Sequence, residues 1–248
     1  MGLTLHYTLR HARPLTPARA EALVRQVRRA AARLVKEREL AAIGRVRKAD
    51  PENPWSCRFV LERRGADTVG HGVRPDCGWM FRVQPGEGCE SAEFGLCRYP
   101  ATIRVGRRTL RTGCAGWGFA GFCKTQYASL RGWDHFLKCH RAVTDLVLLW
   151  EAAGAEVTIK DEGDYWPGRN EARLRASLGE MNGIVAAMAG ALKDAADEGG
   201  PAVESPIFAH GQFELLEAEG MARHAARIGQ AAGLARKVVA QPGLEPGT

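Results

Sequence analysis

Three carboxylates lie within four residues of one another at Asp161, Glu162 and Asp164, directly after a predicted strand. Carboxylate oxygens are hard ligands that hold divalent cations, and a positioned carboxylate can also act as a general base. Tyr165 and Trp166 follow at once and would offer a stacking surface for a base or a sugar. The segment therefore predicts a hydrolase-type site for a phosphorylated, nucleotide or sugar-like ligand, in which the carboxylates either hold a divalent cation or act as general bases without a metal.

The same segment also has the composition of a plain turn, since Asp and Gly are common turn residues. Alternation along an extended chain would point Asp161 and Glu162 to opposite sides of a strand. Gly163 permits a bend that could bring them back together. A catalytic role thus requires at least two of the carboxylates to converge in one cleft.

A cysteine and a histidine form the second candidate for chemistry. Cys123 follows a predicted strand and would be nucleophilic if a neighbouring base lowered its pKa. His140 lies on the inward face of a predicted helix and is the nearest histidine that could serve as that base. The alternative is a small core cysteine and a hydrogen-bonded core histidine, because no sequence signature of a thiol hydrolase surrounds Cys123.

Positive charge is concentrated near the N-terminus. The first fifty residues hold twelve Lys and Arg against four Asp and Glu, a balance of +8, and the whole chain is +7. A helix predicted over residues 17–36 has an apolar stripe at Leu23, Val27, Ala30 and Leu34. Its basic side chains lie on another face: Arg25, Arg28, Arg29, Arg33 and Lys36. This basic face predicts an anionic partner, either nucleic acid or an acidic protein, unless it is only a solvated surface.

The elements that must position these residues form an α+β pattern, for which we expect a mostly antiparallel sheet with helices packed on one face. Apolar alternation and turn residues predict strands, while the 3.6-residue period and capping residues predict helices. Residues 65–78 are poor in apolar side chains and are expected to form an exposed loop. Residues 85–88, rich in Gly, are expected to form a hairpin loop. The strands fall at residues 3–10, 40–48, 55–61, 79–83, 92–99, 102–105, 116–122 and 155–160, and the long helices at 17–36, 134–153 and 170–196.

One α+β domain is predicted over residues 1–220, with residues 221–248 as a peripheral helix or a flexible tail. Within the helix 170–196, small residues recur four apart at Gly179, Gly183 and Ala187. Such a line lets another backbone approach closely. It predicts an internal helix contact or, alternatively, the seam of a homodimer.

Several protein classes do not fit the sequence. No stretch approaches the roughly 20 apolar residues of a membrane-spanning helix, and residues 1–10 lack the apolar core of a signal peptide. The seven cysteines are odd in number and have no paired spacing, which indicates reduced thiols and a cytoplasmic location. Two functions from different classes remain: a cytoplasmic binding protein that uses the basic N-terminal face, and an enzyme that uses the carboxylates after residue 160.

Overall fold

A computed structural model describes the backbone of residues 3–53, 56–197 and 203–239, and the side chains of residues 3–53, 56–196 and 203–226. The chain divides into two compact units, one over residues 3–175 and one from residue 176 onward. Each unit is described by itself below. The predicted α+β class with a mostly antiparallel sheet is confirmed.

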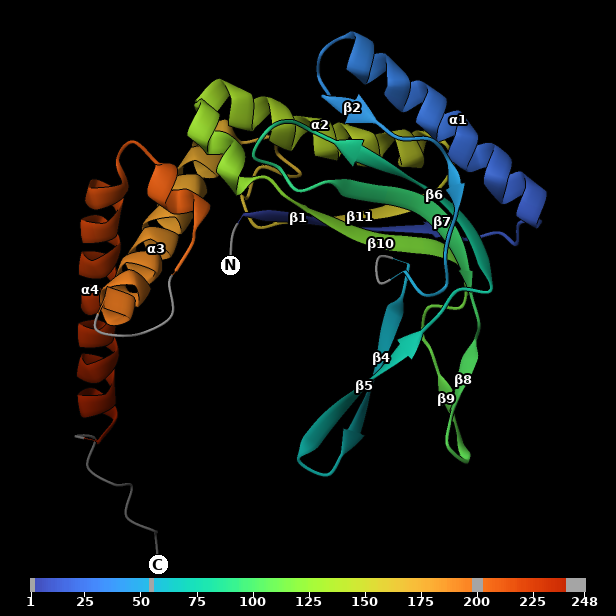
Figure 1. The fold of residues 1–248 in the computed structure, drawn as a ribbon. Helices are drawn as coiled ribbons and strands as arrows, with labels where there is room; N and C mark the ends of the chain where they lie inside the picture. The colour runs from blue at the N-terminus through green and yellow to red at the C-terminus, as the bar shows by residue number, and fades with distance from the viewer. Residues whose placement is uncertain (1–2, 54–55, 198–202, 240–248) are drawn as a thin grey trace, which may run out of the picture. The chain divides into compact units, whose positions relative to one another are not determined.

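A seven-stranded sheet organises the first unit (Figure 1). The strand order is β11-β1-β10-β7-β6-β2, and β3 also pairs with β6. Every pairing is antiparallel, so short turns suffice between several neighbours. The strands are β1 (Thr4–His11), β2 (Ala42–Ile43), β3 (Arg47–Lys48), β6 (Cys77–Gln84), β7 (Ala92–Tyr99), β10 (Gly116–Lys124) and β11 (Glu156–Asp161).

Two helices, α1 (Pro17–Lys36) and α2 (Trp133–Ala152), cover one face of this sheet (Figure 1). The predicted helix 17–36 is confirmed: the Thr16 hydroxyl accepts a hydrogen bond from the amide of Arg19 and Pro17 opens the first turn. Alternation along β1 buries Leu5, Tyr7 and Leu9 against the helices. The intervening side chains of β1, such as Thr8 and Arg10, are exposed on the other face, which no described helix of residues 3–175 covers.

Stacked aromatic rings join the sheet to α2. Phe81 of β6 stacks on Trp150 of α2 and on Phe94 of β7, which in turn stacks on Tyr7 of β1. Large buried rings dominate core energetics, so this stack fixes how the helix layer sits on the sheet. Between β6 and β7, residues 85–91 form the predicted hairpin loop. A short helix, η1 (Gln126–Arg131), leads from β10 into α2.

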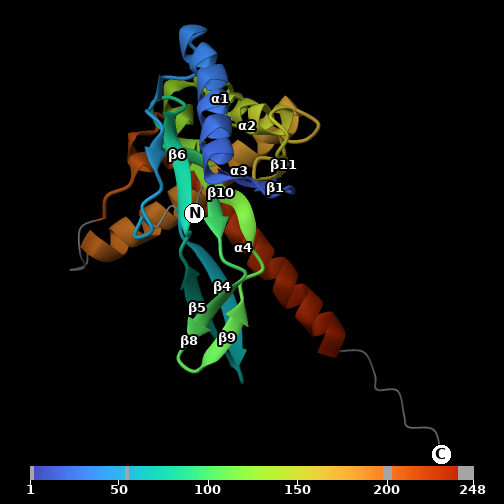
Figure 2. The ribbon, with the colours of Figure 1, turned by 90° about the vertical axis from the view of Figure 1, so that its right-hand side faces the viewer.

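Two β-hairpins extend from the sheet on the side opposite α1 and α2 (Figures 1 and 2). One consists of β4 (Arg58–Arg64) and β5 (Asp67–Val73), and the other of β8 (Thr102–Val105) and β9 (Arg108–Arg111). We call them the two arms. The prediction of a loop over residues 65–78 was wrong, because residues 67–73 form β5. Among the described strands, β5 pairs with β4 alone, and Val73 at its end is its one fully buried residue. The rest of β5 does not pack on the core and therefore lacks apolar alternation.

The second unit is helical. It contains α3 (Glu171–Asp197), which begins in the first unit, the short helix η2 (Pro206–Ala209) and α4 (Phe213–Val239). Gly220 of α4 contacts α3 so closely that a Cβ there would clash with the carbonyl group of Gly183 and crowd Ala187. The predicted internal helix contact is thus confirmed at these two residues, and the homodimer seam stays a prediction. The predicted boundary at residue 220 falls inside α4.

None of the helices that the structure describes combines the length and the apolar character needed to cross a membrane. All seven cysteines are free thiols.

Candidate functional site

The turn after β11 places Asp161 in the interior rather than in a cleft. The side chain is 1% exposed, and its Oδ2 atom lies 3.2 Å from Nε2 of His140. The amides of Tyr165 and Trp166 donate to the same oxygen, while the amide of Gly163 donates to Oδ1 at 2.7 Å. Asp161 therefore closes the turn and ties it to α2.

The three predicted carboxylates do not converge. Glu162 lies on the opposite side of β11, where it accepts a hydrogen bond from the amide of Thr4 and lies 3.6 Å from Nε2 of His6. Asp164 is exposed, with a left-handed backbone at φ = 55°. The strand alternation that separates Asp161 from Glu162 is not undone at Gly163. Within the described ranges, no three His, Cys, Asp or Glu side chains are placed to hold a metal ion.

The two aromatic residues of this turn differ in exposure. Tyr165 is 2% exposed, and the edge of its ring packs on His140. This leaves no open face on which a base or sugar could stack, contrary to the predicted ligand-binding role of Tyr165. Trp166 is half-buried. The hydrolase-type function stays a prediction that this geometry does not favour.

Burial alone would raise the pKa of Asp161. The hydrogen bond and charge of His140, together with the amides of Trp166 and Gly163, outweigh burial and lower the pKa. The carboxylate is thus ionised over the physiological range. His140 also bonds through Nδ1 to the hydroxyl group of Thr125 at 2.9 Å, and both side chains are fully buried. Thr125, His140 and Asp161 form a buried polar chain that links the ends of β10 and β11 to α2.

The structure does not pair Cys123 with His140. Both ring nitrogens of His140 are engaged by Thr125 and Asp161, so neither is available to a thiol. The thiol of Cys123 instead donates to the carbonyl oxygen of Glu90 at 3.2 Å. Burial raises the pKa of Cys123, and the nearby charge of Glu90 raises it further. Both residues fit the core alternative that the sequence left open.

The basic face of α1 is exposed at Arg25, Arg29, Arg33 and Lys36, as its apolar spacing predicts. Arg28 is half-buried and donates through Nε to the carbonyl oxygen of Gly44 at 3.0 Å. Arg25 pairs with Glu21 one turn earlier at 2.7 Å. Arginines also line an open groove of about 420 Å³ between α1 and the following chain: Arg25, Arg28, Arg29 and Arg45. We call this the α1 groove.

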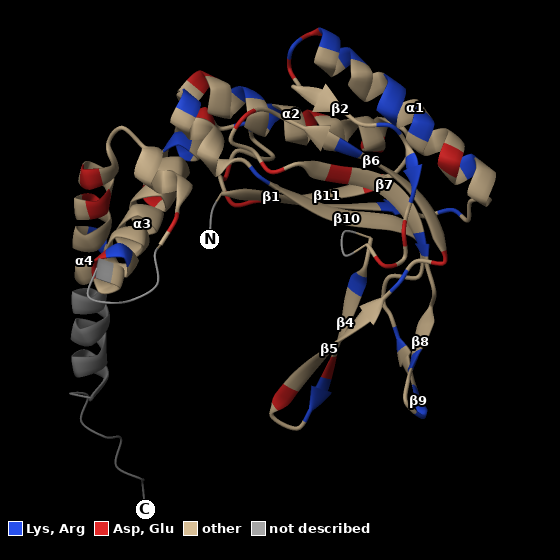
Figure 3. Ribbon diagram, viewed as in Figure 1, with Lys and Arg blue, Asp and Glu red and all other residues tan. Residues whose placement is uncertain are grey.

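The two arms form a second basic region, which the sequence analysis missed (Figure 3). They carry seven arginines against one glutamate and one aspartate, a formal balance of +5. Ion pairs of Glu62 with Arg64 and Arg108 neutralise part of this charge, and the second pair joins one arm to the other. The remaining arm arginines outside these pairs are Arg58, Arg63, Arg104, Arg107 and Arg111.

Glu62 is the electrostatic centre of the arms. A hydrogen bond with Nε2 of His71 at 3.0 Å lowers the pKa of Glu62, and Arg64 and Arg108 lower it further against a partial effect of burial. The carboxylate thus stays charged and holds the two hairpins together. Because Glu62 faces inward between the arms, it does not offset the arginines that face outward.

The outer face of β4 exposes large apolar side chains. Phe59 is 70% exposed and Leu61 is 71% exposed. On the paired strand they stand opposite Gly72 and Gly70, which have no side chains to cover them. Arg63, the next residue on this face, is also exposed. We call Phe59, Leu61 and Arg63 the arm face. Apolar side chains left open beside positive charge are typical of an interaction surface.

No protein-family model, no curated protein and no solved structure matches this chain. The geometry of the described residues is therefore the whole basis for assigning a function.

Proposed function

We propose that the protein binds nucleic acid, with the phosphate backbone held by arginines of the arms and an unpaired base stacked on the arm face. The observation that carries this proposal is the exposure of Phe59 and Leu61 between arginines that have no acidic partner among the described residues. Proteins that bind single strands combine such a basic surface with aromatic rings, because every base has a face that can stack.

The position of Phe59 favours a single strand over a duplex. Side chains that wedge into duplex steps must enter a groove. The tip of this hairpin is Gly65 and Ala66, whereas Phe59 lies near its base on a flat face. A ring in that position suits stacking by an unpaired base.

The α1 groove supports the same function less directly. Its arginines would attract phosphate at long range, since clustered positive charge raises association rates. However, the apolar residue among the described lining, Val46, is half-buried, and Arg25 and Arg28 already have partners within the protein. We assign the groove a secondary, electrostatic role.

The test is fluorescence anisotropy with a labelled single-stranded oligonucleotide of mixed sequence, titrated with the full chain at increasing salt. Four phosphate contacts at a slope of about −0.7 each predict a roughly 50-fold loss of affinity between about 50 and 200 mM salt. A duplex of the same sequence should bind more weakly. An acidic peptide of matched net charge is the control for plain electrostatic attraction. Absence of binding to the oligonucleotide at low salt would overturn the proposal, and equal binding of the peptide would assign the surface to acidic proteins instead.

A further inference from the structure

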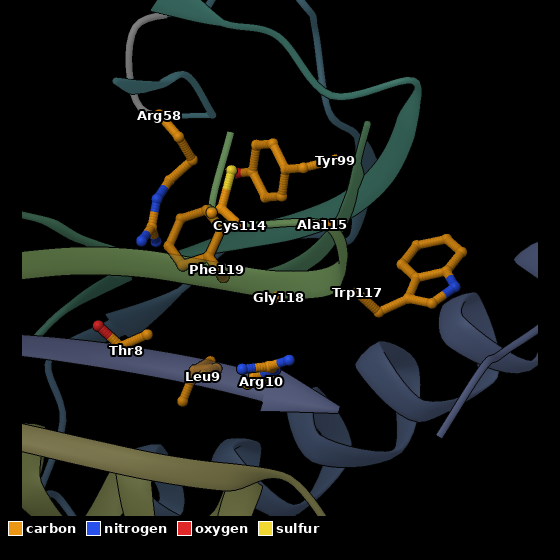
Figure 4. Close-up of a pocket in the computed structure, with 11 residues that line it drawn as sticks. Thr8, Leu9, Arg10, Arg58, Tyr99, Cys114, Ala115, Trp117, Gly118 and Phe119 are labelled. Atoms are coloured by element: carbon orange, nitrogen blue, oxygen red, sulfur yellow. The ribbon is translucent and has the colours of Figure 1, made fainter. Parts of the chain in front are cut away.

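A small cavity lies where the arms meet the sheet (Figure 4). Its volume is about 140 Å³, and β1, β10, the start of β4 and the chain after β9 contribute its lining. In Figure 4, Arg58 extends toward β10 from one side, and Thr8, Leu9 and Arg10 of β1 lie along the other side. Arg10 and Arg58 are the charged residues of this lining.

Neither arginine has a described partner for its charge. Other arginines of the sheet do: Arg98 lies 3.5 Å from Asp76, and Arg47 and Arg82 both bind the buried carboxylate of Glu93 at 2.8 Å. In the described part of the chain, no ion pair or side-chain hydrogen bond that would neutralise Arg10 or Arg58 is found. Two positive charges thus border one cavity with no acid between them.

Two buried hydroxyl groups anchor the chain at Ser56, shortly before Arg58. The Tyr99 hydroxyl donates to the carbonyl oxygen of Ser56 at 2.8 Å, and burial raises the pKa of Tyr99, which keeps that hydroxyl protonated. The Ser56 hydroxyl in turn bonds to the carbonyl oxygen of Asp50 at 2.7 Å. Arg58 follows two residues later, at the start of β4.

Arg10 has a neighbour on each side in the sheet. Its neighbour on β10 is Gly118, where a Cβ would lie 2.8 Å from the carbonyl oxygen of Leu9. Its neighbour on β11 is Glu156, an exposed residue that forms no ion pair with it in the described structure. Glu156 is the nearest acid along the pairing and the natural competitor for the Arg10 charge.

We propose that this cavity binds a phosphate monoester group, with Arg10 and Arg58 as its ligands. Guanidinium groups match phosphate oxygens through paired hydrogen bonds. The cavity volume of about 140 Å³ leaves room for the five heavy atoms of a phosphate group beside the two arginines. The group therefore comes from a free small phosphate or from the terminal phosphate of a strand. The second source rests on the proposed function, and the first does not.

The first experiment is calorimetric titration of the full-length protein with inorganic phosphate, using chloride as the background anion. The wild type should bind, and Arg10→Gln and Arg58→Gln should each lower affinity by about tenfold or more. Arg98→Gln is the matched control, because that arginine is exposed as Arg10 is but already pairs with Asp76, and it should bind as the wild type does. Glu156→Gln should strengthen binding. Absence of phosphate binding by the wild type, or equal losses in Arg98→Gln, would overturn the site.

The second experiment separates the two sources of phosphate. Anisotropy is measured for one oligonucleotide with a 5′-phosphate, a 3′-phosphate or hydroxyl groups at both ends. A preference for one phosphorylated end that Arg58→Gln abolishes assigns the site to a strand terminus. Phosphate binding with no end preference assigns it to small phosphates. If inorganic phosphate binds but no oligonucleotide does, the nucleic-acid function fails while the phosphate site stands.

Tyr99→Phe tests the positioning of Arg58. It removes the hydrogen bond to Ser56 but keeps both arginines and the ring. Phosphate affinity should fall by less than in Arg58→Gln, with the dependence on salt unchanged because the charge is the same. An unaltered affinity would show that Arg58 needs no such support.

Discussion

The α1 face and the two arms are both basic, but the fold uses their charges differently. On α1 the side chains that face the sheet are buried at Ala20, Val24, Val27 and Ala31. Two of its arginines have local tasks: Arg28 binds the Gly44 carbonyl oxygen and Arg25 binds Glu21. Arg33 and Lys36 lie in the last turn, where positive charge stabilises a helix. On the arms, by contrast, Phe59 and Leu61 stay exposed among arginines. Charge alone does not identify a binding surface, whereas charge beside uncovered apolar side chains does.

Removing the arm arginines should have the largest effect on the affinity for a single-stranded oligonucleotide. The variant Arg63→Gln, Arg104→Gln, Arg107→Gln, Arg111→Gln loses four charges that have no ion-pair partner in the described structure. We expect affinity for a single strand to fall on the order of 100-fold at low salt and the salt slope to shrink by about 3. Anisotropy across a salt series measures both. A slope equal to that of the wild type would remove the arms from the interface.

Asp161 is the opposite of the arm arginines, because its charge already has hydrogen-bond partners inside the protein. Asp161→Asn should lower the free energy of unfolding by roughly 2–3 kcal/mol, because buried donors would lose a charged acceptor. Oligonucleotide affinity should be unchanged. Urea unfolding followed by circular dichroism measures the first effect. A loss of binding with stability intact would instead return Asp161 to a functional role.

Asp161 also makes the stability of the fold depend on pH. Because the pKa of Asp161 is lowered in the folded protein, its ionisation stabilises the fold above the usual aspartate value of about 3.9. That contribution is lost as the pH falls below this value through the lowered pKa. The stability difference between the wild type and Asp161→Asn should therefore shrink in acid. A constant difference from pH 7 down to the acid limit would contradict this account.

Substitution of the arginines on the α1 face should have the smallest effect on oligonucleotide affinity. In Arg25→Gln, Arg29→Gln, Arg33→Gln, three exposed charges are lost from a surface with no exposed apolar partner. We expect affinity to fall by less than about tenfold, with a slower association rate at low salt and little change in dissociation. Stopped-flow fluorescence separates the two rates. A greater loss than in the arm variant would reverse the comparison.

The sequence predicts much of the fold because several elements carry complete local signals. Helix α1 has a capping Thr16, Pro17 in its first turn and a clear apolar period, and its bounds match the prediction. β7 likewise matches over residues 92–99. β5 was not predicted because it contains Gly70, Gly72 and polar residues. A strand that lies mostly outside the core does not need alternating apolar side chains.

The candidate site was harder to predict for two physical reasons. The charge of the arms is hidden when residues 51–248 are averaged, because acids elsewhere cancel it. The role of Asp161 depends on the register of β1 with β11 and on the approach of His140, both of which are long-range features. Spacing along the chain placed three carboxylates together, but strand alternation separated them.

The central claim is that the arm face stacks a base, and Phe59→Ala tests it most directly. Phe122→Ala is the matched control, since Phe122 is also an exposed phenylalanine, 36% exposed on the open face of the sheet. With about 1–3 kcal/mol per stacked base, Phe59→Ala should weaken single-strand binding by roughly 5- to 150-fold. Its melting temperature and salt slope should be unchanged, and Phe122→Ala should stay within about twofold of the wild type. Wild-type affinity in Phe59→Ala, or a greater loss in Phe122→Ala, would contradict the account and move the interface to the sheet.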